Sequence, residues 1–176
     1  MKRLLLLCAL TTICLTATAE HERVEGKPVA GIRNLKVIDS MVACAGSITP
    51  ENVSGIKDMG FVSIVNLRRP DEDNARIEEE AAAAQSVGLT YVHIPFNSRA
   101  PDTAAVDEFL AAFSNPGMEP SFVHCAGGSR AAAMWYAKRV ILDGLDKDHA
   151  LEEAQRLGLG SESLTAFIND YIESSR

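Results

Sequence analysis

The stretch from Phe122 to Arg130 carries the residues in this chain that are best suited to chemistry. An apolar run leads to His124 and Cys125, two glycines follow, and Arg130 opens a helical pattern. Glycines let a loop curl so that successive backbone N–H groups point inward. The N-terminus of the next helix and the planar Arg130 guanidinium add positive charge at the same place. Together these features favour a thiolate nucleophile at Cys125 and the binding of a tetrahedral oxyanion.

A simpler interpretation of the same residues is structural. Free cysteine is often buried, so Cys125 alone is compatible with a core strand that ends in a glycine turn and a surface arginine. That interpretation does not explain why strand, Cys, Gly-Gly, Arg and helix follow one another. We therefore expect Cys125 and Arg130 to act together in an active site.

Strands and helices alternate from residue 41 onward, which predicts a single α/β domain. We expect a three-layer sandwich, with a mostly parallel central sheet flanked by helices. In such sheets the ligand site lies beyond the carboxyl ends of the strands. The important loops then begin at Gly46, Arg68, Pro95 and Cys125. Strands are expected at 35–38, 41–44, 61–67, 89–95 and 121–124, and helices at 50–59, 75–87, 103–113, 131–142, 147–157 and 162–172.

The first residues have the pattern of an export signal. A basic pair precedes an apolar run over 4–15, and Ala17-Thr18-Ala19 is typical of a cleavage site. The run is shorter than the roughly 20 residues that a membrane span needs, although an uncleaved anchor is the alternative. We expect a secreted or periplasmic protein without a stable membrane span after cleavage. The predicted divisions are a signal peptide over 1–19, a flexible mature N-terminus over 20–34 and one domain over 35–176.

Composition excludes some classes of partner. The 176 residues carry a formal net charge of -7, which argues against a basic nucleic-acid footprint. An acidic protein still binds a small anion where its pocket is locally positive. The four histidines are scattered, and neither they nor the cysteines have the spacing of metal ligands, so we expect no metal and no cofactor.

Residues 37–157 resemble the cysteine-dependent protein phosphatase superfamily. The similarity is greatest to small bacterial dual-specificity-like and tyrosine phosphatase-like members, including the phosphatase-like domain associated with beta-lactamase-hydrolase-like proteins. It is carried by the segments 62–68, 91–95 and 123–130. The resemblance implies a Cys125 thiolate that attacks phosphorus, a phosphocysteine intermediate and hydrolysis of a phosphorylated protein or small-molecule anion without a metal. It also implies that Arg130 binds phosphate oxygens, that His124 organises the loop, and that the N–H donors come from Ala126, Gly127, Gly128 and Ser129.

Two departures from the family pattern keep other functions open. Four residues separate Cys125 from Arg130, where these phosphatases usually have five, and Ala131 stands where they usually have Ser or Thr. A loop of this length is similar to that of rhodanese-type sulfurtransferases, whose cysteine carries a persulfide. A sulfurtransferase that uses a Cys125 persulfide is therefore the alternative, and a catalytically weak anion-binding module is the second alternative.

A phosphatase also needs a general acid to protonate the leaving oxygen. Asp102, in a loop upstream of the cysteine, is the first candidate, and a helix cap is its alternative role. Asp71 and Glu72 are reserve candidates, with a solvated turn as their alternative.

Cys44 lies at the end of another predicted strand and is a possible redox partner of Cys125. A disulfide requires Cα atoms within about 7 Å of each other. A buried free thiol is the alternative.

Overall fold

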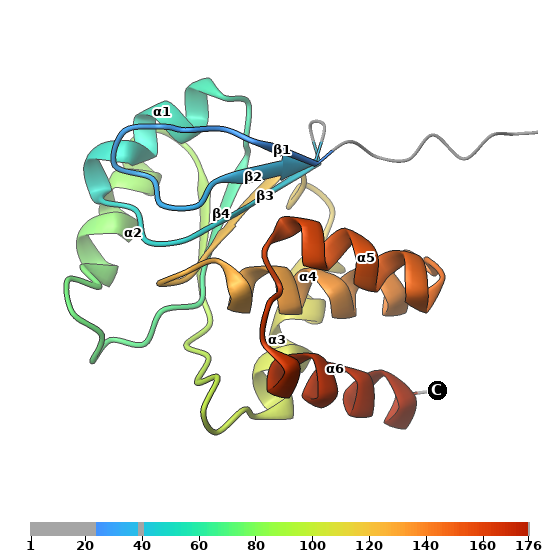
Figure 1. Ribbon diagram of the computed structural model, residues 1–176. Helices are drawn as coiled ribbons and strands as arrows, with labels where there is room; N and C mark the ends of the chain where they lie inside the picture. Colours follow the sequence, from blue (N-terminus) through green and yellow to red (C-terminus); the bar gives the residue numbers. More distant parts are fainter. Residues whose placement is uncertain (1–23, 39–40, 176) are drawn as a thin grey trace, which may run out of the picture.

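The computed structural model describes residues 24–38 and 41–175, and the predicted signal peptide over 1–19 lies outside them (Figure 1). Six strands form one sheet in the order β1-β2-β3-β6-β4-β5. The four strands from β3 to β5 in this order are parallel, whereas β1 and β2 are antiparallel additions at one edge. The predicted mostly parallel sheet is confirmed. The strands are β1 (Val24–Gly26), β2 (Lys36–Ile38), β3 (Val42–Ala45), β4 (Ser63–Asn66), β5 (Thr90–His93) and β6 (Ser121–His124).

Helices cover both faces of the sheet, as the three-layer prediction required (Figure 1). The pair α1 and α2 packs on one face, and α3 to α6 pack on the other. Within residues 24–38 and 41–175, no helix is long and apolar enough to cross a membrane. The helices are a 3-10 turn (Pro50–Asn52), α1 (Val53–Asp58), α2 (Ile77–Ser86), α3 (Thr103–Phe113), α4 (Ser129–Ile141), α5 (Lys147–Leu157) and α6 (Glu162–Ser174).

Side-chain caps explain why several helices begin where the sequence predicts. Asp102, Asp146 and Ser161 each accept a hydrogen bond from a backbone N–H in the first turn of α3, α5 and α6. The start of α4 differs by two residues from the prediction, because the helix already begins at Ser129. The loop after β6 is therefore shorter, and Arg130 belongs to the first turn of α4.

Helix α4 is the central element that holds this loop against the sheet. Ala131, Ala132 and Ala133 are fully buried, and small side chains let a helix approach its neighbours closely. Trp135 is also fully buried and donates from Nε1 to Glu153 Oε1 of α5 at 2.8 Å. The loop after β6, residues 125–128, is thereby tied to the largest hydrophobic cluster of the domain, and we call it the active-site loop.

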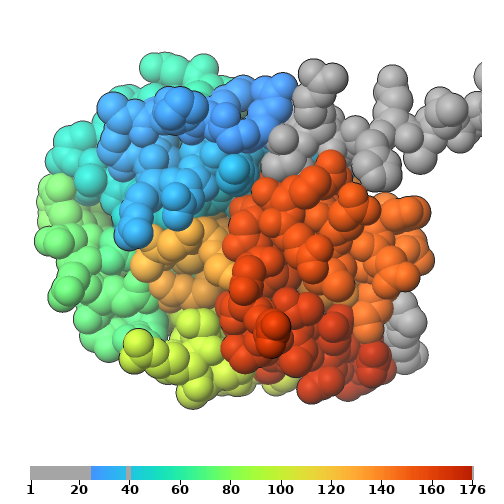
Figure 2. Space-filling model, in the orientation of Figure 1, coloured from blue at the N-terminus to red at the C-terminus, as the bar shows by residue number. Residues whose placement is uncertain are grey.

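Residues 24–34, the described part of the predicted flexible segment over 20–34, make several backbone contacts with the rest of the domain. Residues 24–26 pair with β2, and Ile32 is buried. Arg33 exchanges backbone hydrogen bonds with the chain after β3: its N–H donates to Ser47 O at 3.2 Å, and its carbonyl accepts from Gly46 N–H at 2.7 Å. Figure 2 shows the N-terminal segment, in blue, packed beside light-orange atoms from the region of residue 125.

Gly46 lets this segment approach the active-site loop. A Cβ on Gly46 would lie 2.9 Å from Arg33 Cβ, 3.0 Å from Ala126 O and 3.1 Å from Arg33 O. Two of these atoms belong to the backbone and cannot move aside as the end of a flexible side chain can. We expect Gly46→Ala to lower the free energy of unfolding by about 1–3 kcal/mol, as overpacking typically does. Chemical denaturation measures this change.

Gly55 in α1 is the matched control for this substitution. A Cβ there would meet nothing within 4 Å, so Gly55→Ala should be neutral or stabilising by up to about 1 kcal/mol. Equal free energies of unfolding for the two variants would contradict the close approach at Gly46.

Candidate active site

The candidate site lies at the carboxyl edge of the sheet, where β6 ends between β3 and β4. Ala45, His124 and Asn66 are side by side in register at the ends of these three strands. Cys125 follows directly, is 1% exposed and donates its backbone N–H to Ala45 O at 3.2 Å. The sulfur is thus held at the edge where an α/β sheet binds its ligand.

Two carbonyls of the loop after Cys125 are hydrogen-bonded to the N-terminal side of the domain. Ser47 N–H donates to Ala126 O at 3.1 Å, and Asn34 Nδ2 donates to Gly127 O at 3.0 Å. A trans peptide directs its C=O and N–H to opposite sides. The N–H groups of Gly127 and Gly128 are therefore turned away from these partners.

The Gly128 N–H donates to Cys125 Sγ at 3.0 Å. Gly128 has φ 105°, a backbone conformation that strongly favours glycine, and it is the N-cap of α4. The positive end of the α4 dipole therefore faces the sulfur. Backbone donors and a helix N-terminus of this kind stabilise a thiolate over a thiol.

Arg130 is held beside the sulfur in a single orientation. Its Nη1 donates to Glu72 Oε1 at 2.7 Å, Leu67 O at 3.0 Å and Phe96 O at 2.8 Å, and its Nη2 donates to Glu72 Oε2 at 2.9 Å. Burial by itself would lower the pKa of Arg130, but Glu72 and the charge of Cys125 raise it. Arg130 is therefore a permanent cation of fixed position that adjoins Cys125.

Glu72 is not suited to the reserve role of general acid. Burial would raise its pKa, but hydrogen bonds from Arg130 and from the Arg69 backbone N–H prevail and lower the pKa to about 2. A carboxyl group that is always ionised near neutral pH has no proton to give. Glu72 instead positions Arg130. The other reserve candidate, Asp71, pairs with Arg69 at 2.8 Å on the surface.

Asp102 is exposed and caps α3 by accepting the Ala104 N–H at 3.0 Å. This is the alternative role that the sequence left open. Asp102 lies in the loop that follows β5, which ends beside β4. Its role as general acid stays a prediction.

Behind the loop, His124 takes part in a buried polar network. Its Nε2 lies 2.7 Å from Glu80 Oε1 of α2, and both side chains are at most 1% exposed. Asn66 Nδ2 donates to Glu80 at 3.2 Å and to Tyr91 Oη at 2.9 Å. Burial and the nearby Glu80 charge raise the pKa of Tyr91, so its phenol stays protonated. Glu80 therefore fixes the His124 ring beneath the loop, and the role of His124 in organising the loop stays a prediction.

Sequence reasoning missed Glu80, Glu72's contact with Arg130, and Asn34. Glu80 stands in a run of three acidic residues that reads as a solvated helix face. A signal was nevertheless present, because Glu80 is three residues after Ile77 and four before Ala84, and all three are buried. No signal in the sequence singles out Asn34.

Cys44 and Cys125 are free, buried thiols in the structure. Cys44 is in register with Val123 on the neighbouring strand, two residues before Cys125. Strand spacing then places the two Cα atoms about 8 Å apart, beyond the roughly 7 Å that a disulfide spans. Burial, followed by the charge of Cys125, raises the pKa of Cys44 well above its usual value. A bond between them would require movement of the backbone.

Cys125 directly after a central parallel strand, with Arg130 in the first turn of the buried helix that follows, is the arrangement expected of a cysteine-dependent phosphatase. The family model described as "DSP-PTPase phosphatase fused to NAD+ Kinase" matches residues 14–169. The chain therefore belongs to this family, within the cysteine-dependent protein phosphatase superfamily. The resemblance inferred from the sequence is confirmed.

Solved structures share the fold at low sequence identity. A DUF442 protein from Shewanella putrefaciens CN-32 has a TM-score of 0.68 at 21% identity, over 82% of this chain and 92% of that one. P. aeruginosa TpbA has a TM-score of 0.63 at 20% identity, over 89% and 97%. Tk-PTP in its active form has a TM-score of 0.66 at 20% identity, over 81% and 97%. No curated protein sequence matches the chain.

The ion pair between Glu72 and Arg130 predicts a specific dependence of stability on pH. The pKa of Glu72 falls from 4.5 to about 2 on folding, so the unfolded chain takes up the proton first as the pH drops. The stabilisation is complete above pH 4.5 and is lost as the pH falls through about 2. We expect Glu72→Gln to lack this part of the pH dependence, on the order of 2–3 kcal/mol.

Denaturation of wild type and Glu72→Gln between pH 5 and about pH 2 tests this expectation. Asp71→Asn is the matched control, because its pair with Arg69 is exposed and should contribute little. Parallel stability curves for wild type and Glu72→Gln would contradict the strength assigned to this ion pair.

Proposed function

We propose that the protein is an exported phosphatase that hydrolyses phosphate esters, of the tyrosine or dual-specificity type, through a phosphocysteine intermediate. The observation that carries the proposal is the Gly128 N–H directed at Cys125 Sγ, beside an arginine held in place by Glu72. Backbone N–H groups, a helix N-terminus and a bidentate cation make up a site that favours both a thiolate and a phosphate dianion.

The proposed reaction has two displacements at phosphorus. The Cys125 thiolate attacks phosphorus, a P–S bond forms and the P–O ester bond breaks, while a carboxylic acid donates its proton to the leaving oxygen. Water then attacks phosphorus, the P–S bond breaks and the same carboxylate takes up the proton of the water. Phosphate leaves and the thiolate is regenerated. Arg130 and the loop N–H groups stabilise the charge on the equatorial oxygens in both steps.

Asp102 is the carboxylic acid that we assign to these proton transfers. It lies in the loop after β5, and Glu72 and Asp71 are each committed to an arginine. The substrate class is supported by a structural neighbour at 18% identity, a Cys-to-Ser variant of P. aeruginosa TpbA in complex with phosphotyrosine. Export to the periplasm or the exterior is supported by the sequence pattern of residues 2–19.

Steady-state turnover by the reduced protein tests the reaction class. We expect hydrolysis of p-nitrophenyl phosphate and of a phosphotyrosine peptide, and no sulfur transfer from thiosulfate to cyanide. Cys125→Ser should abolish hydrolysis, because a hydroxyl is a far weaker nucleophile than a thiolate. Cys44→Ser, a second buried thiol on the neighbouring strand, is the matched control and should retain activity.

Four residues separate Cys125 from Arg130, a spacing similar to that of sulfurtransferases, so an absence of phosphatase activity would distinguish between the two alternative functions. Sulfur transfer that depends on Cys125, without phosphatase activity, would replace the proposal with a sulfurtransferase. Binding of phosphate without either reaction would leave an anion-binding module.

The role of Asp102 has its own test. Asn also caps helices well, so Asp102→Asn should preserve α3 while removing the proton. We expect turnover of an alkyl phosphate, which has a poor leaving group, to fall by about 100-fold. Turnover of p-nitrophenyl phosphate should fall much less, because nitrophenolate leaves without protonation. Equal losses for the two substrates would assign Asp102 to the helix cap alone.

A further inference from the structure

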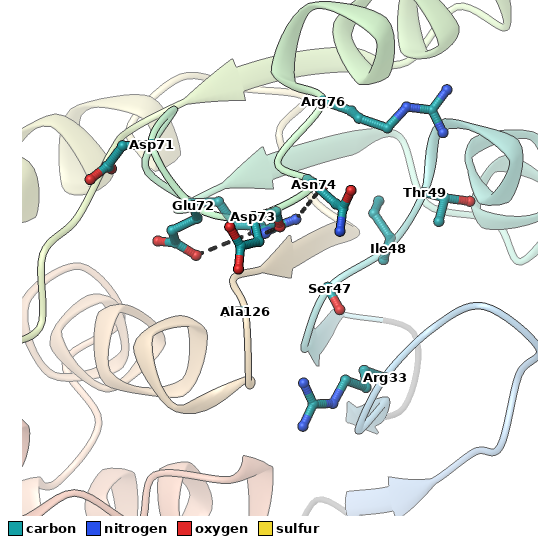
Figure 3. Close-up of a pocket in the computed structure, with 11 residues that line it drawn as sticks. Arg33, Ser47, Ile48, Thr49, Asp71, Glu72, Asp73, Asn74, Arg76 and Ala126 are labelled. Carbon is teal, nitrogen blue, oxygen red and sulfur yellow. Dashed lines mark hydrogen bonds and ion pairs between the residues drawn. The ribbon is translucent and has the colours of Figure 1, made fainter.

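A pocket of about 720 Å³ opens beside the active-site loop. It is bordered by Ala126 of that loop, by the turn after β3 and by the turn after β4 (Figure 3). Its volume is in the range of small-molecule sites. A substrate whose phosphate occupies the loop would extend into this space.

The two sides of the pocket differ in charge. Figure 3 shows Asp73 and Asn74 on one side of Ala126 and Arg33 on the other. Ser47 lies between these sides. Carboxylate, amide and hydroxyl groups bind substrate hydroxyls, whereas the guanidinium attracts an anion.

Arg33 is the one uncommitted cation among the described residues that line this pocket. The Arg68 guanidinium is buried and donates to the carbonyls of Asp73 and Asn74. Arg76 is paired with Glu51 and Glu79. Arg33 is exposed, and in the described part of the chain its guanidinium makes no hydrogen bond or ion pair.

The backbone of Arg33 is nevertheless fixed next to the active-site loop. It forms backbone hydrogen bonds with Gly46 and Ser47, and Ser47 in turn donates to Ala126 O. Arg33 Cβ and Ala126 O both lie within 3.0 Å of the position that a Cβ on Gly46 would occupy. The Arg33 backbone is thus held in place beside the loop that follows Cys125, while its guanidinium extends from it without a partner among the described residues.

We propose that Arg33 is a specificity-determining residue that binds a second anionic group of the substrate. The substrate class is a small phosphorylated polyol with two phosphates, one in the loop of Cys125 and one at Arg33. Hydroxyl groups between them face Asp73, Asn74 and Ser47. The Asp73 carboxylate repels an anion, so it directs the second phosphate to the Arg33 side. This inference rests on the proposed phosphatase function.

Three substrates measured side by side test this proposal: fructose 1,6-bisphosphate, fructose 6-phosphate and p-nitrophenyl phosphate. Wild type should have a higher kcat/KM for the bisphosphate than for the monophosphate. Arg33→Gln should lower the ratio of bisphosphate to p-nitrophenyl phosphate kcat/KM by about five- to tenfold, the effect expected of a partly exposed charge-assisted contact. The ratio in wild type should also fall as salt is added.

Arg99→Gln is the matched control, because Arg99 is another exposed arginine in a loop at the carboxyl edge of the sheet but does not line the pocket. It should leave the ratio unchanged. Equal ratios in wild type and Arg33→Gln, with p-nitrophenyl phosphate hydrolysed normally, would overturn the role of Arg33.

A binding measurement separates this proposal from the proposed reaction. Fructose 1,6-bisphosphate is titrated calorimetrically into the Cys125→Ser protein, with and without Arg33→Gln. Binding weakened about five- to tenfold by Arg33→Gln would support the Arg33 subsite even if the native protein hydrolyses no ester. Unchanged binding would overturn the subsite, whatever the outcome of the hydrolysis assays.

Discussion

The orientation of a few peptide groups after β6 is the constraint on which the active site depends. A peptide presents an acceptor on one side and a donor on the other, so a loop that surrounds an anion must hydrogen-bond its carbonyls elsewhere. Here the Ser47 N–H donates to the carbonyl of Ala126, and Asn34 Nδ2 donates to the carbonyl of Gly127. Both partners come from segments that precede β4 in the sequence. The N-terminal part of the domain is therefore a structural component of the site and not an appendage to it.

A second set of interactions places charge around this loop. Glu72 pairs with Arg130 and orients it, while the carbonyls of Leu67 and Phe96 accept further hydrogen bonds from Arg130 Nη1. A buried cation without these partners would be strongly destabilising. Beneath the loop, Glu80 contacts His124. Cys125 thereby lies between a cation held by hydrogen bonds and a buried polar network.

Features encoded by neighbouring residues were predicted from the sequence, and features that join distant segments were not. The bounds of α3, β6 and α5 agree with prediction because caps and breakers act within a few residues. The site loop was recognised for the same reason. Asn34 contacts Gly127 across 93 positions and Glu72 contacts Arg130 across 58, and no local pattern indicates such pairs. Only the folded structure shows that Glu72 is the acidic residue that pairs with Arg130.

The role proposed for the loop is to make Cys125 a nucleophile toward phosphorus. The most direct measurement is mass spectrometry of the wild-type protein, mixed briefly with p-nitrophenyl phosphate and quenched in acid, which preserves a thiophosphate ester long enough for analysis. We expect one added phosphoryl group on the peptide that contains Cys125, and none in Cys125→Ser. Turnover of the ester with no phosphoryl group on Cys125 at any quench time, or with the group on another residue, would contradict this role.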